Sequence, residues 1–584
     1  MKRGDFSANS RLFYLATISL GIGVMASFVA LVLIKLINFF TNLFFFGKFS
    51  IAAASPATHL LGAWVILIPA LGGLIIGLMA RFGSERIRGH GIPEALEAIL
   101  FGKSIMQPKV AVLKPLSSAI SIGSGGPFGA EGPIIMTGGA IGSLIAQLFH
   151  LTASERKTLL VSGAAAGMSA IFASPIAAVL LAVELLLFEW RPRSLVPVAL
   201  ASIVAAALRP WLLGSAGPVF PLQMQIDAMQ ISGLLACCGV GLIAGVFSAA
   251  TSSLLYKMED AFHRLPIHWM WWCVLGGLFV GLGGYFQPRA LGVGYDVIEE
   301  LLSGHVLLQA ALALLAVKSL IWVISLASGT SGGVLAPLLM MGCGLGVVEA
   351  QFLPESFRLL YPLVSMAAVM GGMMRAPFTA VIFALELTHN VDALVPLLTA
   401  TIFSYATTVV LMKRSILTEK VARRGYDIFR EYGVDPLETT RVDEVMTKTV
   451  ISISSELSLE EVKSNYFNGY LKFRGYPVID GSGSLRGIIT ASDVLTNRLQ
   501  GSSVGEFTGK SAGDLANDQV VSVLPHESCR EAAERMAAFG IGRLPVVSAQ
   551  NSREMIGIIS RSDLLKPRLD QHELEMKRER IFNF

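Results

Sequence analysis

Charged side chains are scarce in this chain of 584 residues. Asp, Glu, Lys and Arg together make up 15% of it, whereas they make up roughly a quarter of a typical soluble domain. The formal net charge is only +4, which excludes the strongly basic surface of a nucleic-acid-binding protein. We therefore expect no nucleic-acid partner, and the composition as a whole is not that of a soluble domain.

Cysteines and catalytic motifs are also few. The five cysteines show neither the spacing of metal ligands nor the pattern of a secreted disulfide framework, so we predict no metal site. The HExxH motif of a zinc protease is absent. The GSGG segment that begins at Gly123 resembles a serine-hydrolase motif only superficially, and no histidine base accompanies it. The sequence therefore predicts a protein that is not an enzyme.

Long apolar segments, by contrast, are abundant. Apolar residues make up 53% of the chain, and the mean hydropathy is +0.62. An apolar helix of about 20 residues can cross a bilayer, and interior Gly, Pro and charged residues are typical of broken helices around a polar path. The sequence therefore predicts an integral, multi-pass protein of the cell (inner) membrane, and Lys2, Arg3 and Arg11 favour a cytoplasmic N-terminus. The expected crossings lie in eight stretches: 13–46, 60–79, 159–188, 231–255, 269–286, 306–326, 366–387 and 394–412.

The segment SIGSGGPFGAEGP, at 121–133, places one carboxylate, Glu131, in a glycine-dense break between two apolar runs. A charged side chain at membrane depth costs at least ~2.5 kcal/mol, so it normally faces an ion or water path. The glycines end one helix and Pro133 suits the first turn of the next, which puts Glu131 at a helix N-terminus. Free N–H groups there bind anions, and a tethered carboxylate would compete for them. We therefore predict that Glu131 gates an anion path.

The membrane part repeats itself. In the first half GPFGAEGP is followed by FASPIAAVLLAVE, where Pro175 precedes Glu184 by nine residues. In the second half GTSGGVLAP is followed by MRAPFTAVIFALE, where Pro377 precedes Glu386 by nine residues. Paired interrupted segments indicate a transporter whose substrate site lies at the interface of the repeats. We interpret the two glutamates as buried carboxylates that accept hydrogen bonds from nearby backbone and serve helix packing.

The glycine-rich segments resemble the ion filter of the CLC family of chloride channels and proton/chloride antiporters, and the resemblance covers nearly the whole chain. The family's GSGIP, G(K/R)EGP and GxFxP appear here as GHGIP at 89–93, GAEGP at 129–133 and GVLAP at 333–337. The resemblance implies that Glu131 is the gate, that Lys114 is a basic residue near the pore, and that two copies form a homodimer with one path each. It also implies that filter residues bind the anion, in part through backbone amides: His90, Gly91, Ala130, Glu131, Gly132, Gly333, Val334, Leu335 and Leu417.

Three filter positions depart from the family pattern. His90 replaces the family's serine, Leu335 replaces the phenylalanine of GxFxP, and Leu417 occupies the position of the filter tyrosine. A neutral imidazole donates one hydrogen bond and a protonated one adds charge, which would make anion binding depend on pH. Alternatively, His90 turns aside and only backbone donors remain. Chloride is the expected anion, and nitrate stays open because in this family replacement of that serine by proline accompanies nitrate preference.

A fourth departure concerns proton coupling. In FASPIAAVLLAVEL, Glu184 aligns with the first of two adjacent glutamates of the family, and Leu185 aligns with the second, the internal proton-transfer site of many antiporters. Leucine carries no proton, which favours an uncoupled channel. Proton-coupled exchange stays open as the alternative, because some coupled members of the family lack this acid and Glu184 is one residue away.

The composition changes sharply near Lys413, and beyond Val442 short β-branched runs alternate with amphipathic helix patterns. RGIITASD at 486–493 and IGIISRSD at 556–563 lie about seventy residues apart and resemble a pair of CBS domains. Because Ser and Asp are also good helix caps, a capping role alone stays open for the repeated Ser, Thr and Asp residues. The resemblance implies that four of them bind the ribose of an adenine nucleotide (ATP, ADP or AMP): Thr490, Asp493, Ser560 and Asp563.

The predicted architecture is a polytopic all-α membrane domain with two inverted-topology repeats and broken helices, followed by a cytoplasmic α/β pair of CBS domains. The predicted function is transport of chloride, a small inorganic anion, across a lipid bilayer by a voltage-gated CLC-type channel that requires no cofactor. The open alternatives are a proton-coupled antiporter, a channel for another anion, and more distantly a CBS-bearing cation transporter, which would need pore-lining acids. The expected boundaries are 1–424 for the membrane domain, 425–441 for a linker, 442–500 and 511–566 for the CBS domains, and 567–584 for a charged tail.

Overall fold

The computed structural model of the chain describes residues 10–214, 217–222, 231–426, 428, 436–467, 473, 475–494, 511–516, 520–567 and 569. It divides into two compact units, one up to Ile428 and one after it. Part of the expected linker at 425–441 and nearly all of the expected tail at 567–584 lie outside the described residues. The two units are described separately.

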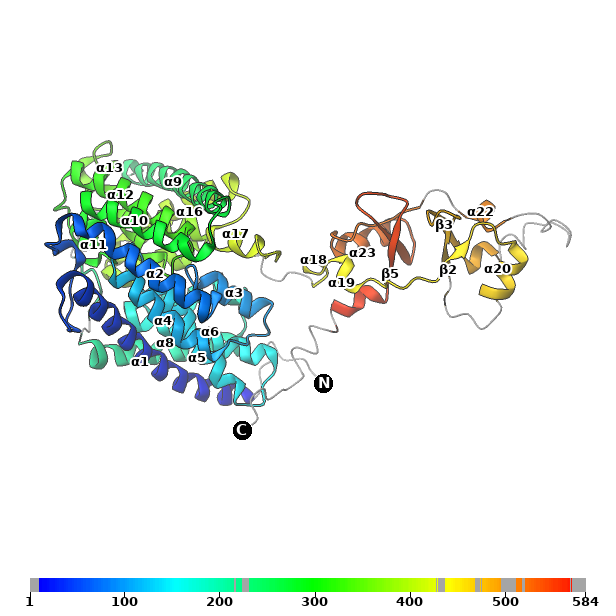
Figure 1. Ribbon diagram of the computed structural model, residues 1–584, viewed down its shortest axis with the longest axis horizontal. Coiled ribbons are helices and arrows are strands. Elements are labelled where there is room, and N and C mark those ends of the chain that lie inside the picture. The colour runs from blue at the N-terminus through cyan, green and yellow to red at the C-terminus, as the bar shows by residue number, and fades with distance from the viewer. Residues whose placement is uncertain are drawn as a thin grey trace. The chain divides into compact units, whose positions relative to one another are not determined.

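Unit 1 is built of helices (Figure 1). The order of helices in its second half repeats that in its first. The first half contains α1 Arg11–Phe46, α2 Leu67–Phe82, α3 Ile92–Leu100, α4 Pro108–Gly123, α5 Glu131–Gln147, α6 Ala153–Phe172, α7 Pro175–Leu181 and α8 Pro192–Leu213. The second half contains α9 Ile231–His263, α10 Trp272–Phe286, α11 Tyr295–Leu302, α12 Leu308–Ala327, α13 Leu335–Glu349, α14 Tyr361–Met374, α15 Pro377–Thr388 and α16 Leu394–Leu411. Helix α17, Ile416–Ala422, follows the second half.

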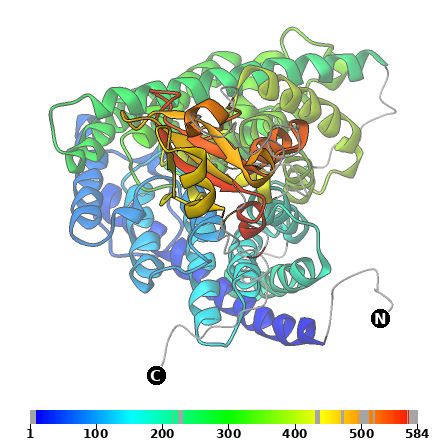
Figure 2. The same cartoon turned by 90° about the vertical axis from the view of Figure 1, so that its right-hand side faces the viewer.

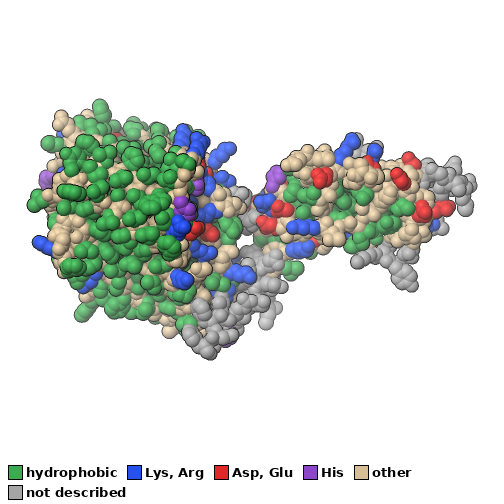
Figure 3. All heavy atoms as spheres, in the orientation of Figure 1, with side chains coloured by type: hydrophobic (Ala, Val, Ile, Leu, Met, Phe, Trp, Pro, Cys, Tyr) green, Lys and Arg blue, Asp and Glu red, His purple; other side chains and the backbone are tan. Residues whose placement is uncertain are grey.

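Among the described residues, seven helical stretches are long and apolar enough to cross a membrane. Apolar side chains cover most of the visible surface of unit 1, while Lys and Arg gather on the face that carries α17 (Figure 3). One of these helices, α8, is missing from the eight expected stretches because Pro197, Arg209 and Pro210 interrupt its apolar run. Two expected crossings, 159–188 and 366–387, were wrong as single helices, since each is broken in the middle.

The two breaks occupy equivalent places in the repeats. Helix α6 ends at Ala173, which has φ 55°, and α14 ends at Arg375, which has φ 56°. A left-handed residue stops the helix, and Pro175 or Pro377 then begins the next one, where a missing N–H has no cost. In the first half, α7 continues as a π-helical stretch over Ala182–Leu187. The broken helices predicted from the sequence are therefore present, and the breaks make α7 and α15 short, separate helices.

Unit 2 combines short helices with small sheets (Figure 2). Strands β1 Ile453–Ser454, β2 Gly475–Ile479 and β3 Leu485–Thr490 form one sheet, and β4 Arg543–Val547 pairs antiparallel with β5 Met555–Ser560 in another. The helices are α18 Pro436–Thr439, α19 Val442–Val445, α20 Leu459–Tyr466, α22 Ala512–Leu515 and α23 Cys529–Ala538. Each half opens with a segment that packs into the other half: α19 lies in the core of the β4–β5 sheet, and α22 lies in the core of the β1–β3 sheet.

Candidate functional site

The three glycine-rich segments meet inside unit 1. The N–H of Gly129 donates to the carbonyl of Gly333 at 3.2 Å, and the N–H of Gly333 donates back to Gly129 at 2.9 Å, which forms an isolated antiparallel bridge. The N–H of Gly89 donates to Gly329 at 3.3 Å, and the N–H of Gly332 donates to Gly89 at 3.3 Å. These backbone hydrogen bonds join segments that lie some two hundred residues apart in the sequence.

Helix N-termini converge on this junction. Helix α3 begins after Gly91, α5 begins after Ala130, and α13 begins after Val334. The first turn of each helix has N–H groups without a partner inside the helix, and the helix dipole adds a partial positive charge. The arrangement therefore offers an anion several neutral backbone donors, which suits an ion that must bind and then leave.

Glu131 lies at the centre of the junction and is fully buried. Its carboxylate accepts a hydrogen bond from the hydroxyl of Tyr295 at 3.2 Å, and it lies close to the backbone N–H groups of Glu131 and Ala336. Among the described residues, Glu131 Oε2 has no hydrogen-bond partner of ordinary geometry. A Cβ atom added to Gly333 would stand 2.8 Å from this oxygen. The carboxylate therefore occupies space at the N-terminus of α13, where the helix offers donors.

His90 and Gly132 touch each other through the backbone. A Cβ atom added to Gly132 would overlap the carbonyl oxygen of His90, so this approach requires glycine. The imidazole of His90 is 2% exposed, and its Nδ1 has no hydrogen-bond partner among the described residues. Buried polar atoms are normally paired, so an unpaired one calls for a partner such as a bound ion or water.

Two buried lysines brace the junction from equivalent places. Lys114 of α4 donates to the carbonyls of Ile87 and Gly89 at 2.8 and 2.7 Å, and to the hydroxyl of Ser331 at 3.0 Å. Lys318 of α12 donates to the carbonyls that precede α11, at Ala290 and Gly292, at 2.9 and 2.8 Å. Each ammonium group therefore holds a loop that leads into a short helix of the junction. Lys114 is fully buried beside Gly89, the first residue of the GHGIP segment.

The apolar departures from the family pattern are all buried. Leu335 is the first residue of α13, and Leu417 lies in α17 beside Ile416, whose carbonyl accepts a hydrogen bond from Tyr256. Leu185 lies in the π-helical stretch after α7. All three leucines are 0% exposed, and none of these positions supplies a polar side chain.

The repeated glutamates bind each other's helices. Glu184 accepts hydrogen bonds from the N–H groups of Phe378 and Thr379 at the start of α15, at 3.2 and 2.8 Å. Glu386 accepts from the N–H groups of Ile176 and Ala177 at the start of α7, at 3.0 and 2.8 Å. Each carboxylate thus caps a helix N-terminus of the opposite repeat, which confirms the packing interpretation.

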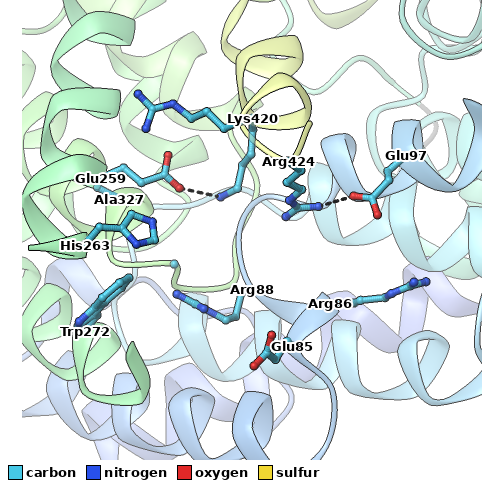
Figure 4. Close-up of a pocket in the computed structure, with 12 residues that line it drawn as sticks. Glu85, Arg86, Arg88, Glu97, Glu259, His263, Trp272, Ala327, Lys420 and Arg424 are labelled. Atoms are coloured by element: carbon cyan, nitrogen blue, oxygen red, sulfur yellow. Dashed lines mark hydrogen bonds and ion pairs between the residues drawn. The ribbon is translucent and has the colours of Figure 1, made fainter. Parts of the chain in front are cut away.

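A cavity of about 630 Å³ lies beside the filter loops and beneath α17 (Figure 4). Gly329 contributes to its wall, so the cavity reaches the junction. Three of its cations are ion-paired: Arg424 binds Glu97 at 2.7 Å, Lys420 lies 3.6 Å from Glu259, and Arg423 binds Asp260. Arg424 also binds Glu94 of α3 at 2.7 Å. Basic side chains outnumber acidic ones in the wall: Arg86, Arg88, Lys420, Arg423 and Arg424 against Glu85, Glu97 and Glu259.

Unit 2 has its own cavity of about 1090 Å³. Thr490, Asp493 and Ser560 line it, together with Arg543 and Arg561, whose guanidinium groups suit phosphate. Asp493 Oδ2 accepts from the Thr490 hydroxyl at 2.6 Å, which makes this pair a local cap as well.

Asp563 is placed differently from its counterpart. It is 6% exposed, its Oδ2 accepts from the Ser560 hydroxyl at 2.6 Å, and its Oδ1 lies 2.6 Å from the ammonium group of Lys566. Burial alone would raise the pKa of Asp563, but the hydrogen bonds from Lys566 and Ser560 lower it below its ordinary value. Of the four predicted nucleotide ligands, three therefore face the cavity of unit 2 and Asp563 does not.

Several residues of the junction were missed from the sequence. Tyr295 stands in GVGYD, which matches no filter motif, and the partner of Arg424 on α3, Glu94, is 330 residues away in the chain. Lys318 had a usable signal, because it precedes Leu335 by the same seventeen residues that separate Lys114 from Glu131.

Comparisons with known proteins agree with this architecture. The family model described as voltage gated chloride channel matches residues 71–409, and the CBS domain model matches residues 442–499 and 512–570. A putative chloride channel protein, ClcB-like, of Ralstonia nicotianae is 27% identical over 375 residues, which are 62% of this chain and 87% of that protein. The H(+)/Cl(-) exchange transporter ClcA of Salmonella paratyphi A is 26% identical over 367 residues, 59% of this chain and 76% of that protein.

A solved structure has the same fold. The crystal structure of a eukaryotic CLC transporter covers 95% of this chain and 99% of its own, with a TM-score of 0.62 and 17% identity. The match extends over both units of the chain, and the match to the channel family model covers more than half of it. The chain therefore belongs to the voltage-gated chloride channel family, the CLC family, and carries two CBS domains after its membrane unit.

Proposed function

We propose that this protein transports chloride across a membrane along a path that the carboxylate of Glu131 closes. The observation that carries the proposal is the position of that carboxylate, fully buried where the N-termini of α5 and α13 meet. A bound anion and the carboxylate compete for the same donors, so the path opens when the carboxylate is protonated or displaced. The free Nδ1 of buried His90 supports a further contact with the anion.

The test is chloride efflux from liposomes that contain the purified protein, with proton movement recorded in the same vesicles and a chloride gradient as the sole driving force. We expect chloride efflux in the wild type and faster, pH-independent efflux in Glu131→Gln. A Glu131→Gln variant whose efflux titrates like the wild type would show that Glu131 is not the gate. Efflux of nitrate but not of chloride would contradict chloride as the transported anion and would indicate that His90 and Leu417 alter the selectivity of the filter.

We propose further that the transport is passive. Leu185 puts an apolar, buried side chain at the family's internal proton-transfer position, and Glu184 is occupied as a cap of α15. Exchange is the second candidate, because one relative is named an H(+)/Cl(-) exchange transporter. Chloride efflux without uphill proton movement supports a channel. Proton movement in fixed ratio to chloride supports exchange, and its loss in Glu184→Gln would assign the proton route to Glu184.

The resemblance to the family also supports a homodimer with one path in each subunit. Ile176 and Phe378, at the starts of the cross-capped helices α7 and α15, are 59% and 56% exposed, so this face is available to a second copy. Chemical cross-linking in native membranes tests the assembly. A chain that stays monomeric in the membrane would contradict it.

The face of unit 1 that carries α17 is rich in Lys and Arg, which supports a cytoplasmic position for this face, for the N-terminus and for the CBS pair in the cell membrane (Figure 3). The cavity of unit 2 supports binding of an adenine nucleotide, with Asp493 on the ribose and Arg543 or Arg561 on phosphate. Calorimetric titration of the purified protein with ATP and AMP tests this: we expect saturable binding that Asp493→Asn weakens. If Asp493→Asn bound the nucleotides as tightly as the wild type, Asp493 would serve only as a helix cap.

A further inference from the structure

Tyr295 stands where no motif of the filter predicts a polar side chain. It is the first residue of α11, the second-half counterpart of α3, and its hydroxyl donates to Glu131 Oε1 at 3.2 Å. The filter has no tyrosine at position 417 and no serine at position 90, so the hydroxyls expected there are missing. The hydroxyl of Tyr295 reaches the gate from the opposite repeat.

Several contacts fix the position of this hydroxyl. The ring of Tyr295 packs edge-on against Phe172 and Phe220, with centroids 6.1 Å apart in each case. The loop before it is held by Lys318 through the carbonyls of Ala290 and Gly292, and the N–H of Gly292 donates to Gly125 at 3.1 Å. A side chain that is packed and tethered in this way loses little entropy when it forms its hydrogen bond.

We propose that Tyr295 is a positioning residue that holds the charged carboxylate of Glu131 in the closed position. The proposal rests on the gating role proposed for Glu131. A hydroxyl that donates to a carboxylate stabilises its charged form. Lys318 is a second group that favours the charged form of Glu131, and Arg209 of α8 acts on Tyr295 itself. The closed state is therefore stabilised by the hydroxyl of Tyr295 together with the helix N-termini, and acid opens the path by removing the charge that they hold.

The decisive variant is Tyr295→Phe, which removes one oxygen and keeps the ring. We expect chloride efflux at neutral pH to rise about tenfold, because a hydrogen bond to a charged group is lost from the closed state. The pH of half-maximal efflux should move upward, since less acid is then needed to discharge Glu131. Tyr361→Phe is the matched control: Tyr361 is buried, and its hydroxyl donates to the carbonyl of Pro354 at the same 3.2 Å.

The same substitution in a Glu131→Ala background tests whether Tyr295 acts through the carboxylate of Glu131 or directly on the anion path. With no carboxylate to hold, Tyr295→Phe should leave efflux unchanged within about twofold. Unchanged efflux of Tyr295→Phe in the wild-type background would overturn the proposal, and so would an equal change in both backgrounds, because the hydroxyl would then act on the anion or the fold.

Infrared difference spectra test the hydrogen bond between Tyr295 and Glu131 independently of chloride transport. The carboxyl bands of Glu131, identified by subtraction of Glu131→Gln spectra, should shift in Tyr295→Phe, and the band of the protonated form should appear at higher pH. This shift supports the hydrogen bond even if the liposomes show no chloride efflux, an outcome that would overturn the proposed function only. Identical spectra of wild type and Tyr295→Phe would overturn the proposal about Tyr295 whatever the efflux.

Discussion

The carboxylate of Glu184 in the first repeat accepts two hydrogen bonds from Thr379 in the second, one from the backbone N–H at 2.8 Å and one from the hydroxyl at 2.6 Å. Glu386 makes the converse contact with α7. Hydrogen bonds of this kind to a charged group are worth about 1.5–3 kcal/mol each. The two repeats are therefore tied by a pair of reciprocal helix caps.

Glu184→Ala should lower the free energy of unfolding by ~3 kcal/mol, because it leaves the first N–H groups of α15 and the hydroxyl of Thr379 unpaired. The thermal unfolding temperature of the purified protein in detergent measures the loss. Glu355→Ala, in an exposed turn, is the control and should unfold like the wild type. An unchanged unfolding temperature in Glu184→Ala would contradict the role of the cap.

Gly132→Ala should reduce chloride efflux at least about tenfold, because the new Cβ would overlap the carbonyl oxygen of His90 and push α3 away from α5. Efflux from liposomes measures the effect. Gly239→Ala in α9 is the matched control, since a Cβ at that position meets nothing within 4 Å. Wild-type efflux in Gly132→Ala would mean that this close approach is not needed for transport.

Lys114→Met and Lys318→Met should have similar effects, because each removes an ammonium group that binds two loop carbonyls. A hydrogen bond to a charged group is worth about 1.5–3 kcal/mol, so both variants should unfold at lower temperature and transport less chloride. Lys109→Met, at an exposed position of α4, is the control. A strong effect of one variant and none of the other would show that the two braces are not equivalent.

Arg424→Gln should change transport more than Arg423→Gln. Arg424 pairs with Glu94, whose side chain is 4% exposed and whose Oε2 also accepts from the N–H of Gly91, whereas Arg423 pairs with the exposed Asp260. Loss of Arg424 removes an ion pair from the buried carboxylate of Glu94, next to the filter, and leaves it with the hydrogen bond from Gly91. Efflux and hydrogen exchange of α3 measure the outcome, and equal effects of the two substitutions would argue against a special role for Arg424.

The stability of unit 2 should fall in acid partly through Asp563. Its pKa is lowered in the folded state, so its contribution is complete above the ordinary value for Asp, about 3.9, and is lost as the pH falls through the lowered value. Hydrogen-exchange protection of β5 in the full-length protein, corrected for intrinsic exchange rates, measures the loss. Asp563→Asn should be less stable at neutral pH and should lose less on acidification. A parallel decline of both proteins would contradict this contribution.

The position of the filter could be predicted from the sequence because each of its motifs lies within one short segment. The glycines around Glu131 break a helix by themselves, and Pro133 restarts one, so the position of the carboxylate at a helix start needs no tertiary information. The repeat made the glycine-rich segment of the second half, GTSGGVLAP at 329–337, recognisable in the same way.

Long-range contacts could not be predicted in this manner. The caps at Glu184 and Glu386 join residues about two hundred positions apart, and a glutamate at the end of an apolar helix looks alike whether it caps a helix or carries protons. Tyr295 illustrates the same limit, because only the folding of the second repeat onto the first brings its hydroxyl to Glu131. Helix α8 was missed for a different reason: its prolines and Arg209 interrupt the hydropathy pattern, but Arg209 is buried in the unit and donates to the carbonyls of Ile171 and Gly217.

The reciprocal caps also constrain how the chain is made. Glu184 leaves the ribosome 195 residues before Thr379, an interval of ~10–40 s at ordinary rates of synthesis. During that interval the finished first half holds a carboxylate and an uncapped α7 whose final partners do not yet exist. Each half therefore depends on the other to complete its helix caps. A destabilising substitution near the start of α15 should for this reason make the first half, which is already inserted in the membrane, a target of quality-control proteases.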